Sequence, residues 1–139
     1  MTRINVVPVE ELSDQHLLAE YHELPRVIKQ WCYTGMAPRK YVLGKGHVKW
    51  ARRHMHYLLE RYCRLCAEMV YRDFRVNYSY KQLMYYVLDN VLGLAWYLNY
   101  FPTKDDIKLN RNRLIEKYRL KPNWYHWTKR QKPSYMEIK

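Results

Sequence analysis

Apolar residues recur at steps of three and four along most of the chain, which is the spacing of one buried helix face. This spacing predicts helices over about 14–31, 47–74, 81–100 and from Pro102 to Pro122. Strand-length alternation of apolar and polar residues is missing. We therefore expect an all-α fold of about three to four helices with turn-rich connectors, in one domain over residues 1–139. The expected buried stripes are Leu17, Tyr21, Leu24, Ile28 and Trp31 in the first helix, Val48, Ala51, Met55, Leu58, Tyr62, Leu65 and Met69 in the second, and Ile107, Leu114, Ile115 and Tyr118 in the last.

Capping residues predict where two of these helices begin. Ser13 or Asp14 is a plausible N-cap of the first helix. Thr103 followed by Asp106 resembles a capping box at the start of the last.

The apolar stretch over 83–101 is too short for a membrane span. Asp89 interrupts it, and its uncharged part falls well below the about 20 residues that a span requires. We expect a buried or interfacial helix here.

The charge pattern indicates a polyanionic partner. The chain has 25 Lys and Arg against 13 Asp and Glu, a net charge of +12, and no acidic residue lies between Glu23 and Glu60. The segment from Lys117 to Lys139 is also basic and rich in aromatic residues. Cations interleaved with flat rings suit phosphates and unstacked bases, so nucleic acid is the favoured partner. A tyrosine-rich core beneath a solvated basic surface would give the same composition.

The three cysteines favour an intracellular protein with reduced thiols. Cys32, Cys63 and Cys66 are odd in number, and no apolar leader precedes them. Cys63 and Cys66 stand three apart in the second predicted helix, where small core residues are favoured over a metal site. We expect a cytoplasmic protein that is not secreted.

The first predicted helix carries a polar face opposite its apolar stripe. At about 100° per residue, Glu23 lies there among donors and cations, pointing away from the core. The residues of this face are Gln15, His16, His22, Glu23, Arg26, Lys29 and Gln30.

Four segments together resemble one family of repair enzymes. "MTRIN", "DQHLLAEYHELPRV", "LGKGHVKW" and "RLIEKYRLKPNWY" stand in the order found in the pyrimidine-dimer DNA glycosylases of the phage T4 endonuclease V type. The resemblance implies a small, basic, all-helical monomer without metal or cofactor. Such an enzyme binds duplex DNA containing cyclobutane pyrimidine dimers, cuts a glycosidic bond and nicks the strand as an abasic-site lyase. The family is understood to kink the duplex and extrude a base opposite the lesion.

The resemblance also implies roles for individual residues. Thr2 matches the family's nucleophile and Glu23 its essential carboxylate. His22 stands where the best-known member has arginine, and Trp124 and Tyr125 match an aromatic motif near the C-terminus. The positions that match DNA contacts are Arg3, Gln15, His16, Arg26, Arg113 and Lys117.

Position alone makes the Thr2 amine an effective nucleophile. A small residue 2 favours removal of Met1, which leaves a free α-amine on Thr2. An α-amine has a pKa of about 7.7–8.0 against about 10.4 for lysine, so a far larger fraction is neutral at pH 7. We expect the Thr2 amine to attack C1′ of the damaged nucleotide and form an imine, with Glu23 carrying the proton transfers.

Two alternatives remain open at this point. The first alternative is the same chemistry on other lesions, such as formamidopyrimidine purines, because residues 77–101 bear little likeness to the family. The second alternative is a non-catalytic DNA-binding protein that keeps the basic surface.

Overall fold

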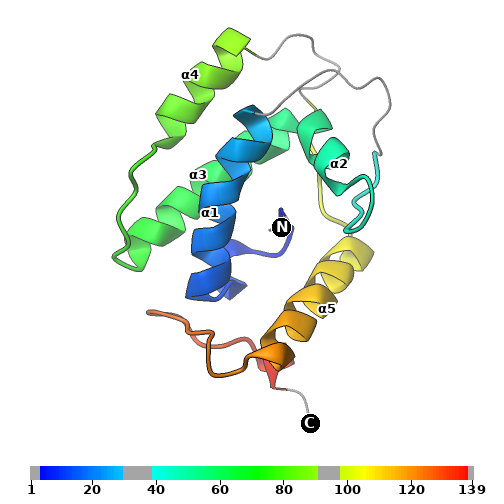
Figure 1. The fold of residues 1–139 in the computed structure, drawn as a ribbon, viewed down its shortest axis with the longest axis vertical. Helices are drawn as coiled ribbons and strands as arrows, with labels where there is room; N and C mark the ends of the chain where they lie inside the picture. Colours follow the sequence, from blue (N-terminus) through cyan, green and yellow to red (C-terminus); the bar gives the residue numbers. More distant parts are fainter. Residues whose placement is uncertain (1–3, 30–38, 91–97, 138–139) are drawn as a thin grey trace.

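The computed structural model describes residues 4–29, 39–90 and 98–137, and over that part of the chain it is all-helical, as the sequence predicts (Figure 1). Helices α1 and α3 lie against each other at the centre, and their apolar stripes form the core. Leu17, Leu24, Leu58 and Leu65 are fully buried at this contact. The elements are η1 (Val9–Glu11), α1 (Asp14–Lys29), α2 (His47–Arg53), α3 (Met55–Tyr71), α4 (Tyr80–Asn90), α5 (Lys104–Leu120) and η3 (Ser134–Met136).

The predicted helix over 47–74 is wrong in one respect, because it breaks at His54. In a continuous helix the Tyr57 N–H would donate to the Arg53 carbonyl. Here the Leu98 N–H donates to Arg53 at 3.3 Å, and Tyr57 donates to the Leu98 carbonyl at 3.5 Å. His54 leaves the helical conformation, with φ −109° and ψ 53°, and separates α2 from α3. A distant segment therefore satisfies the backbone groups that the helix gives up.

The predicted helix over 81–100 is also too long. Helix α4 ends at Asn90, residues 91–97 lie outside the described residues, and 98–103 are not helical. Leu83 and Val87 of α4 are buried, whereas Tyr85 and Leu88 are more than half exposed. The helix therefore buries one face only. None of the described helices is long and apolar enough to cross a membrane.

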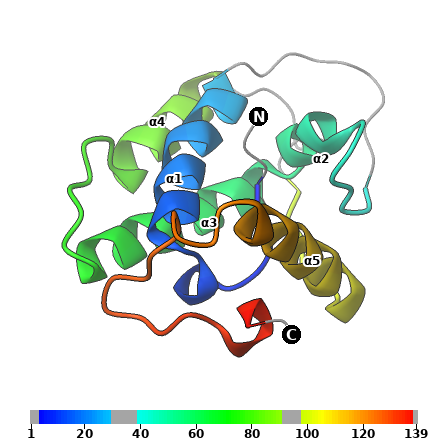
Figure 2. The ribbon, with the colours of Figure 1, turned by 60° about the horizontal axis from the view of Figure 1, so that its bottom comes forward.

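The expected helix caps are confirmed. The Ser13 hydroxyl accepts the His16 N–H at 3.1 Å, so Ser13 rather than Asp14 caps α1. Thr103 and Asp106 form the capping box of α5. After α5 the C-terminal segment returns to the start of α1, where the Asp14 N–H donates to the His126 carbonyl at 2.7 Å (Figure 2).

The cysteine prediction is only half right. Cys66 is partly buried against the core, but Cys63 is exposed. Cys32 lies outside the described residues.

Candidate functional site

Glu23 lies on the outer face of α1, in its C-terminal half. Its side chain is 20% exposed, and its Oε2 lies 4.0 Å from an Arg26 guanidinium nitrogen. The Arg26 side chain is 70% exposed. His22 is exposed as well, with its ring edge-on to Tyr21 at 5.1 Å. The helical period therefore places one carboxylate, the arginine paired with it and one imidazole together on the outer face of α1, as the sequence predicts.

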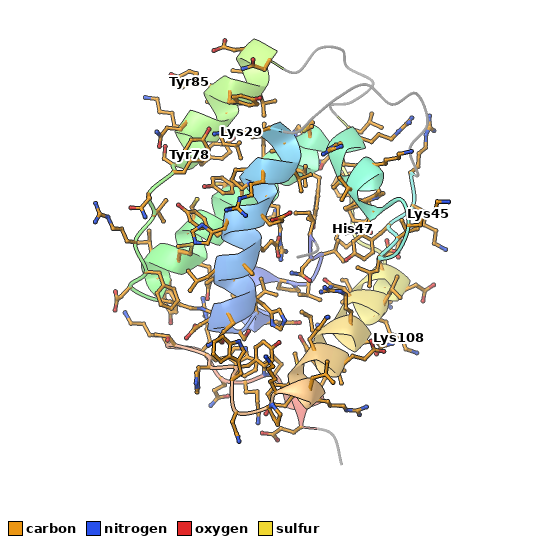
Figure 3. The ribbon with its side chains drawn as sticks, viewed as in Figure 1. Lys29, Lys45, His47, Tyr78, Tyr85 and Lys108 are labelled. Carbon is orange, nitrogen blue, oxygen red and sulfur yellow. The ribbon has the colours of Figure 1, made fainter. Side chains whose placement is uncertain are left out.

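A pocket of about 200 Å³ opens beside this face. Its walls come from α1, from α3 and from the loop that precedes α4, and Figure 3 shows Lys29 and Tyr78 next to each other there. The Lys29 ammonium lies 4.3 Å from the centre of the Tyr78 ring. The lining residues are Tyr21, His22, Pro25, Arg26, Lys29, Tyr62, Asn77 and Tyr78. The pocket thus combines flat aromatic walls with a cationic rim.

A second group of predicted DNA contacts gathers at the other end of α1. The His16 ring stacks on Tyr125 with centroids 4.7 Å apart and planes 5° from parallel. The Gln15 side-chain oxygen accepts the His126 N–H at 3.0 Å. Both α1 side chains were expected to be solvent-facing, but the C-terminal segment covers them. Trp124, which precedes Tyr125 in the chain, is 60% exposed.

Arg113 and Lys117 of α5 place positive charge beside His16. The pKa of His16 is lowered from 6.5 to about 4, mainly by burial and in smaller part by the charges of these two cations. Lys117 is exposed and Arg113 is partly buried. Sequence reasoning placed these four residues at a DNA surface, and the structure brings His16, Arg113, Lys117 and Tyr125 together. The neutral His16 ring serves there as a packing surface for Tyr125.

The His16 environment predicts acid sensitivity. Between pH of about 6.5 and 4 the unfolded chain binds a proton at His16 and the folded chain does not. Stability from this residue is therefore complete above pH 6.5 and is lost as the pH falls towards 4. Urea unfolding of the wild type and of His16→Phe, which keeps a flat ring, measures this. We expect the variant's free energy of unfolding to fall less steeply with falling pH over this range. The difference between the two slopes should be at most the slope that corresponds to one bound proton. Parallel curves would contradict the assignment.

The segment Ile4–Val7 is buried, and side chains from distant parts of the chain hold its backbone. The Ile4 N–H donates to His47 Nε2 at 2.9 Å, and the Tyr41 hydroxyl donates to the Ile4 carbonyl at 3.0 Å. The Tyr57 hydroxyl donates to the Asn5 carbonyl at 3.1 Å. Ile4 and Asn5 are each 2% exposed or less.

The next two residues are held by α5 and α3. Asn110 Oδ1 accepts the N–H groups of Val6 and Val7 at 2.6 and 3.1 Å, and the Asn110 amide donates to Asn5 Oδ1 at 2.7 Å. The Arg61 guanidinium donates to the Val7 carbonyl. Because buried backbone groups must be paired, these bonds fix the path of the segment.

A buried ion pair anchors this arrangement to α1. Arg61 Nε lies 2.7 Å from Glu20 Oε2, and neither side chain is more than 3% exposed. The Asn5 amide donates to the other Glu20 oxygen at 2.7 Å. Glu20 therefore joins α3 and the N-terminal segment to the middle of α1.

Removing one partner of this pair should be costly. Arg61→Met leaves the Glu20 carboxylate buried without its cation, so we expect a loss of about 3–5 kcal/mol in the free energy of unfolding. Arg64→Met, at an exposed position of the same helix, is the control and should change it by less than about 0.5 kcal/mol. Urea unfolding at pH 7 measures both. Equal effects of the two substitutions would show that the ion pair does not anchor the fold.

Sequence reasoning missed these anchoring residues, although two of them carried a signal. Glu20 stands between Leu17 and Leu24 at steps of three and four, and Arg61 stands likewise between Leu58 and Leu65. Charged residues within an apolar stripe indicate a buried ion pair. His47, Tyr41, Tyr57 and Asn110 carried no comparable signal.

Two predicted site residues fall outside the described residues. Thr2 and Arg3 immediately precede Ile4. Within the described part of the chain, no three or more His, Cys, Asp or Glu side chains are grouped to hold a metal ion.

A comparison with known protein families identifies one match. The model of the family described as pyrimidine dimer DNA glycosylase matches residues 1–82 of the 139. The match includes the N-terminal segment, α1, α2 and α3, and it ends within α4. Arg113, Lys117, Trp124 and Tyr125 lie beyond it. The matched residues carry Glu23, its exposed cationic face and the anchored N-terminal segment, and the chain belongs to the pyrimidine dimer DNA glycosylase family, a family of DNA repair enzymes.

Proposed function

We propose that this chain is a bifunctional DNA glycosylase and abasic-site lyase that excises cyclobutane pyrimidine dimers through the Thr2 amine. It acts as one monomeric domain over residues 1–139, on duplex DNA and without a cofactor. The observation that carries this proposal is the anchored N-terminal segment, whose path leads back towards Glu23.

The direction of that segment follows from its contacts with α1 and its neighbours. Asn5 contacts Glu20, whereas Arg72, which pairs with Asp14 at the start of α1, reaches the Val9 carbonyl at 3.4 Å. The segment therefore runs antiparallel to α1 as far as Val9. Glu23 lies about 4.5 Å further along α1 than Glu20. The three residues from Asn5 back to Thr2 span up to about 10 Å, which is enough to bring the Thr2 amine to Glu23.

The amine performs the covalent chemistry. Its neutral nitrogen attacks C1′ of the damaged nucleotide, the glycosidic bond breaks, and the base leaves with a proton. The C1′–O4′ bond then opens and a protonated imine forms between C1′ and the Thr2 nitrogen. Withdrawal of electrons by this imine acidifies the C2′ hydrogen. Loss of that proton gives an enamine, whose electron pair expels the 3′ phosphate and nicks the strand. Hydrolysis of the imine releases the enzyme.

Glu23 is the group that moves protons in this scheme. A carboxylate at its position accepts the C2′ proton and stabilises the cationic imine. Arg26, 4.0 Å away, offsets the repulsion between this carboxylate and the DNA phosphates.

The remaining predicted contacts hold the duplex. Arg113 and Lys117 bind backbone phosphates, and Trp124 offers an exposed ring to a base or sugar. Gln15 and His16 act mainly by holding the C-terminal segment, because both contact it directly. Arg3 and His22 are further contacts with the duplex in this proposal. Such binding falls steeply with salt.

The pocket beside His22 and Arg26 is suited to an extruded base. A dimer weakens stacking and pairing, which lowers the few kcal/mol that extrusion costs. Aromatic walls such as Tyr78 receive the ring, and Arg26 and Lys29 at the rim face the phosphates.

Strand nicking of matched duplexes tests the proposed substrate. We expect purified chain to nick a duplex with one cyclobutane dimer, and to leave the undamaged duplex intact. Preferential cleavage of a duplex with a formamidopyrimidine purine would overturn the assignment of the lesion, but it would still support the proposed glycosylase and lyase reaction. Salt-dependent binding with no cleavage of any substrate, abasic duplex included, would favour the DNA-binding alternative.

A further inference from the structure

His47, the first residue of α2, is held between two backbone groups. It is 2% exposed, and it lies at the N-terminal end of α2, next to the loop that precedes this helix (Figure 3). Its Nδ1 is 2.6 Å from the Val42 carbonyl oxygen, and its Nε2 is 2.9 Å from the Ile4 nitrogen. The carbonyl only accepts and the Ile4 amide only donates. His47 is therefore neutral, with its proton on Nδ1 and its lone pair on Nε2.

Neighbouring rings hold the imidazole in this orientation. Tyr41 contacts it edge-on at 5.8 Å, and Trp50 stacks beside it at 5.8 Å. The Tyr41 hydroxyl also donates to the Ile4 carbonyl at 3.0 Å. His47 and Tyr41 thus fix Ile4 through its N–H and its C=O.

We propose that His47 is a positioning residue for the Thr2 nucleophile. The inference rests on the proposed function. Ile4 is two residues after Thr2, and two residues of chain span at most about 7 Å between the Thr2 amine and the Ile4 nitrogen. A misplacement of about 1 Å at a reacting group can cost about a hundredfold in rate. By fixing the Ile4 N–H, His47 directs the last part of the chain before the amine.

The other anchors of the segment act further from the nucleophile, because even Tyr41 holds the Ile4 carbonyl, which follows the Ile4 N–H along the chain. Asn110 and Arg61 hold Val6 and Val7, and Tyr57 holds the Asn5 carbonyl. Losing the His47 bond therefore releases the Ile4 N–H, the anchored group nearest Thr2, while the Ile4 carbonyl and the rest of the segment stay bound. This separates positioning of the amine from stability of the fold.

Two substitutions at His47 distinguish its two hydrogen bonds. In His47→Gln the side-chain amide reaches the place of Nε2 and can accept from Ile4. In His47→Asn the amide reaches only the place of Nδ1 and keeps the Val42 contact. The readout is single-turnover imine formation with abasic duplex, trapped by borohydride at saturating enzyme, together with the Kd for the duplex and the thermal midpoint.

We expect His47→Asn to slow trapping by about 10- to 100-fold, with the Kd within about twofold of wild type. His47→Gln should recover most of the rate. His54→Asn is the control, because His54 is buried against the same Trp50 ring and its Nδ1 bonds to the Trp50 carbonyl at 2.7 Å. That variant should form the adduct at the wild-type rate per bound complex, whatever it does to the thermal midpoint.

A measurement on the wild type avoids any folding defect of the variants. Proton–nitrogen NMR should show a neutral His47 with its proton on Nδ1, and an Ile4 amide protected from exchange. A fully exchanging Ile4 amide, or equal trapping rates for His47→Gln and His47→Asn, would overturn the role of His47 alone. A wild-type chain that forms no adduct would overturn the proposed function, and the role of His47 with it.

Discussion

Glu23→Gln is expected to bind dimer-bearing duplex as tightly as the parent chain and to nick it at least about a hundredfold more slowly. The amide has nearly the shape of the carboxylate but accepts no proton at neutral pH, and positioned proton transfer contributes about 10²- to 10⁴-fold to rate. Binding should hold or improve, since one negative charge leaves a DNA-facing surface where Arg26 stands 4.0 Å away.

The experiment compares single-turnover nicking and Kd for wild type, Glu23→Gln and Glu60→Gln. Glu60 is an exposed acid on α3 and serves as the charge-matched control. Its substitution should leave the nicking rate within about twofold of wild type, the change typical of a solvated surface position. Nicking by Glu23→Gln at the rate of this control would remove Glu23 from the mechanism.

The second large effect is expected from extending the N-terminus. One uncleaved residue before Thr2 displaces the α-amine by about 3.5 Å, while Ile4–Val7 stay held by their side-chain anchors. The amine then no longer meets C1′, and we expect glycosylase and lyase activity to fall by at least about a hundredfold.

Mass spectrometry of the intact chain must first confirm that the extra residue is retained. A chain extended after Lys139 is the control for the added length and should keep full activity. The Kd for dimer-bearing duplex should stay within about twofold for both. Normal nicking by a chain with a verified extension before Thr2 would place the nucleophile elsewhere.

The helical faces were predictable because they depend on local spacing. The stripe of α1 placed Leu17, Leu24 and Ile28 inside and Glu23 and Arg26 outside, as the structure has them. The caps of α1 and α5 were equally local. The break at His54 was not predictable, since it depends on backbone bonds from Leu98, more than forty residues away.

The site was predictable only where one element forms it. Helical period alone places His22, Glu23 and Arg26 together. His16 was expected in solvent and is covered by Tyr125, which arrives from the far end of the chain. The hydrogen bonds that hold Ile4–Val7 come from α2, α3, α5 and the segment before α2. No local sequence pattern predicts such distant partners.

The most direct measurement locates the covalent adduct. Mature chain is incubated with abasic duplex and borohydride, digested, and sequenced by mass spectrometry. We expect that Met1 is absent and that the reduced sugar is attached to the α-nitrogen of Thr2. An adduct on a lysine side chain, or none on a chain confirmed to begin at Thr2, would contradict it.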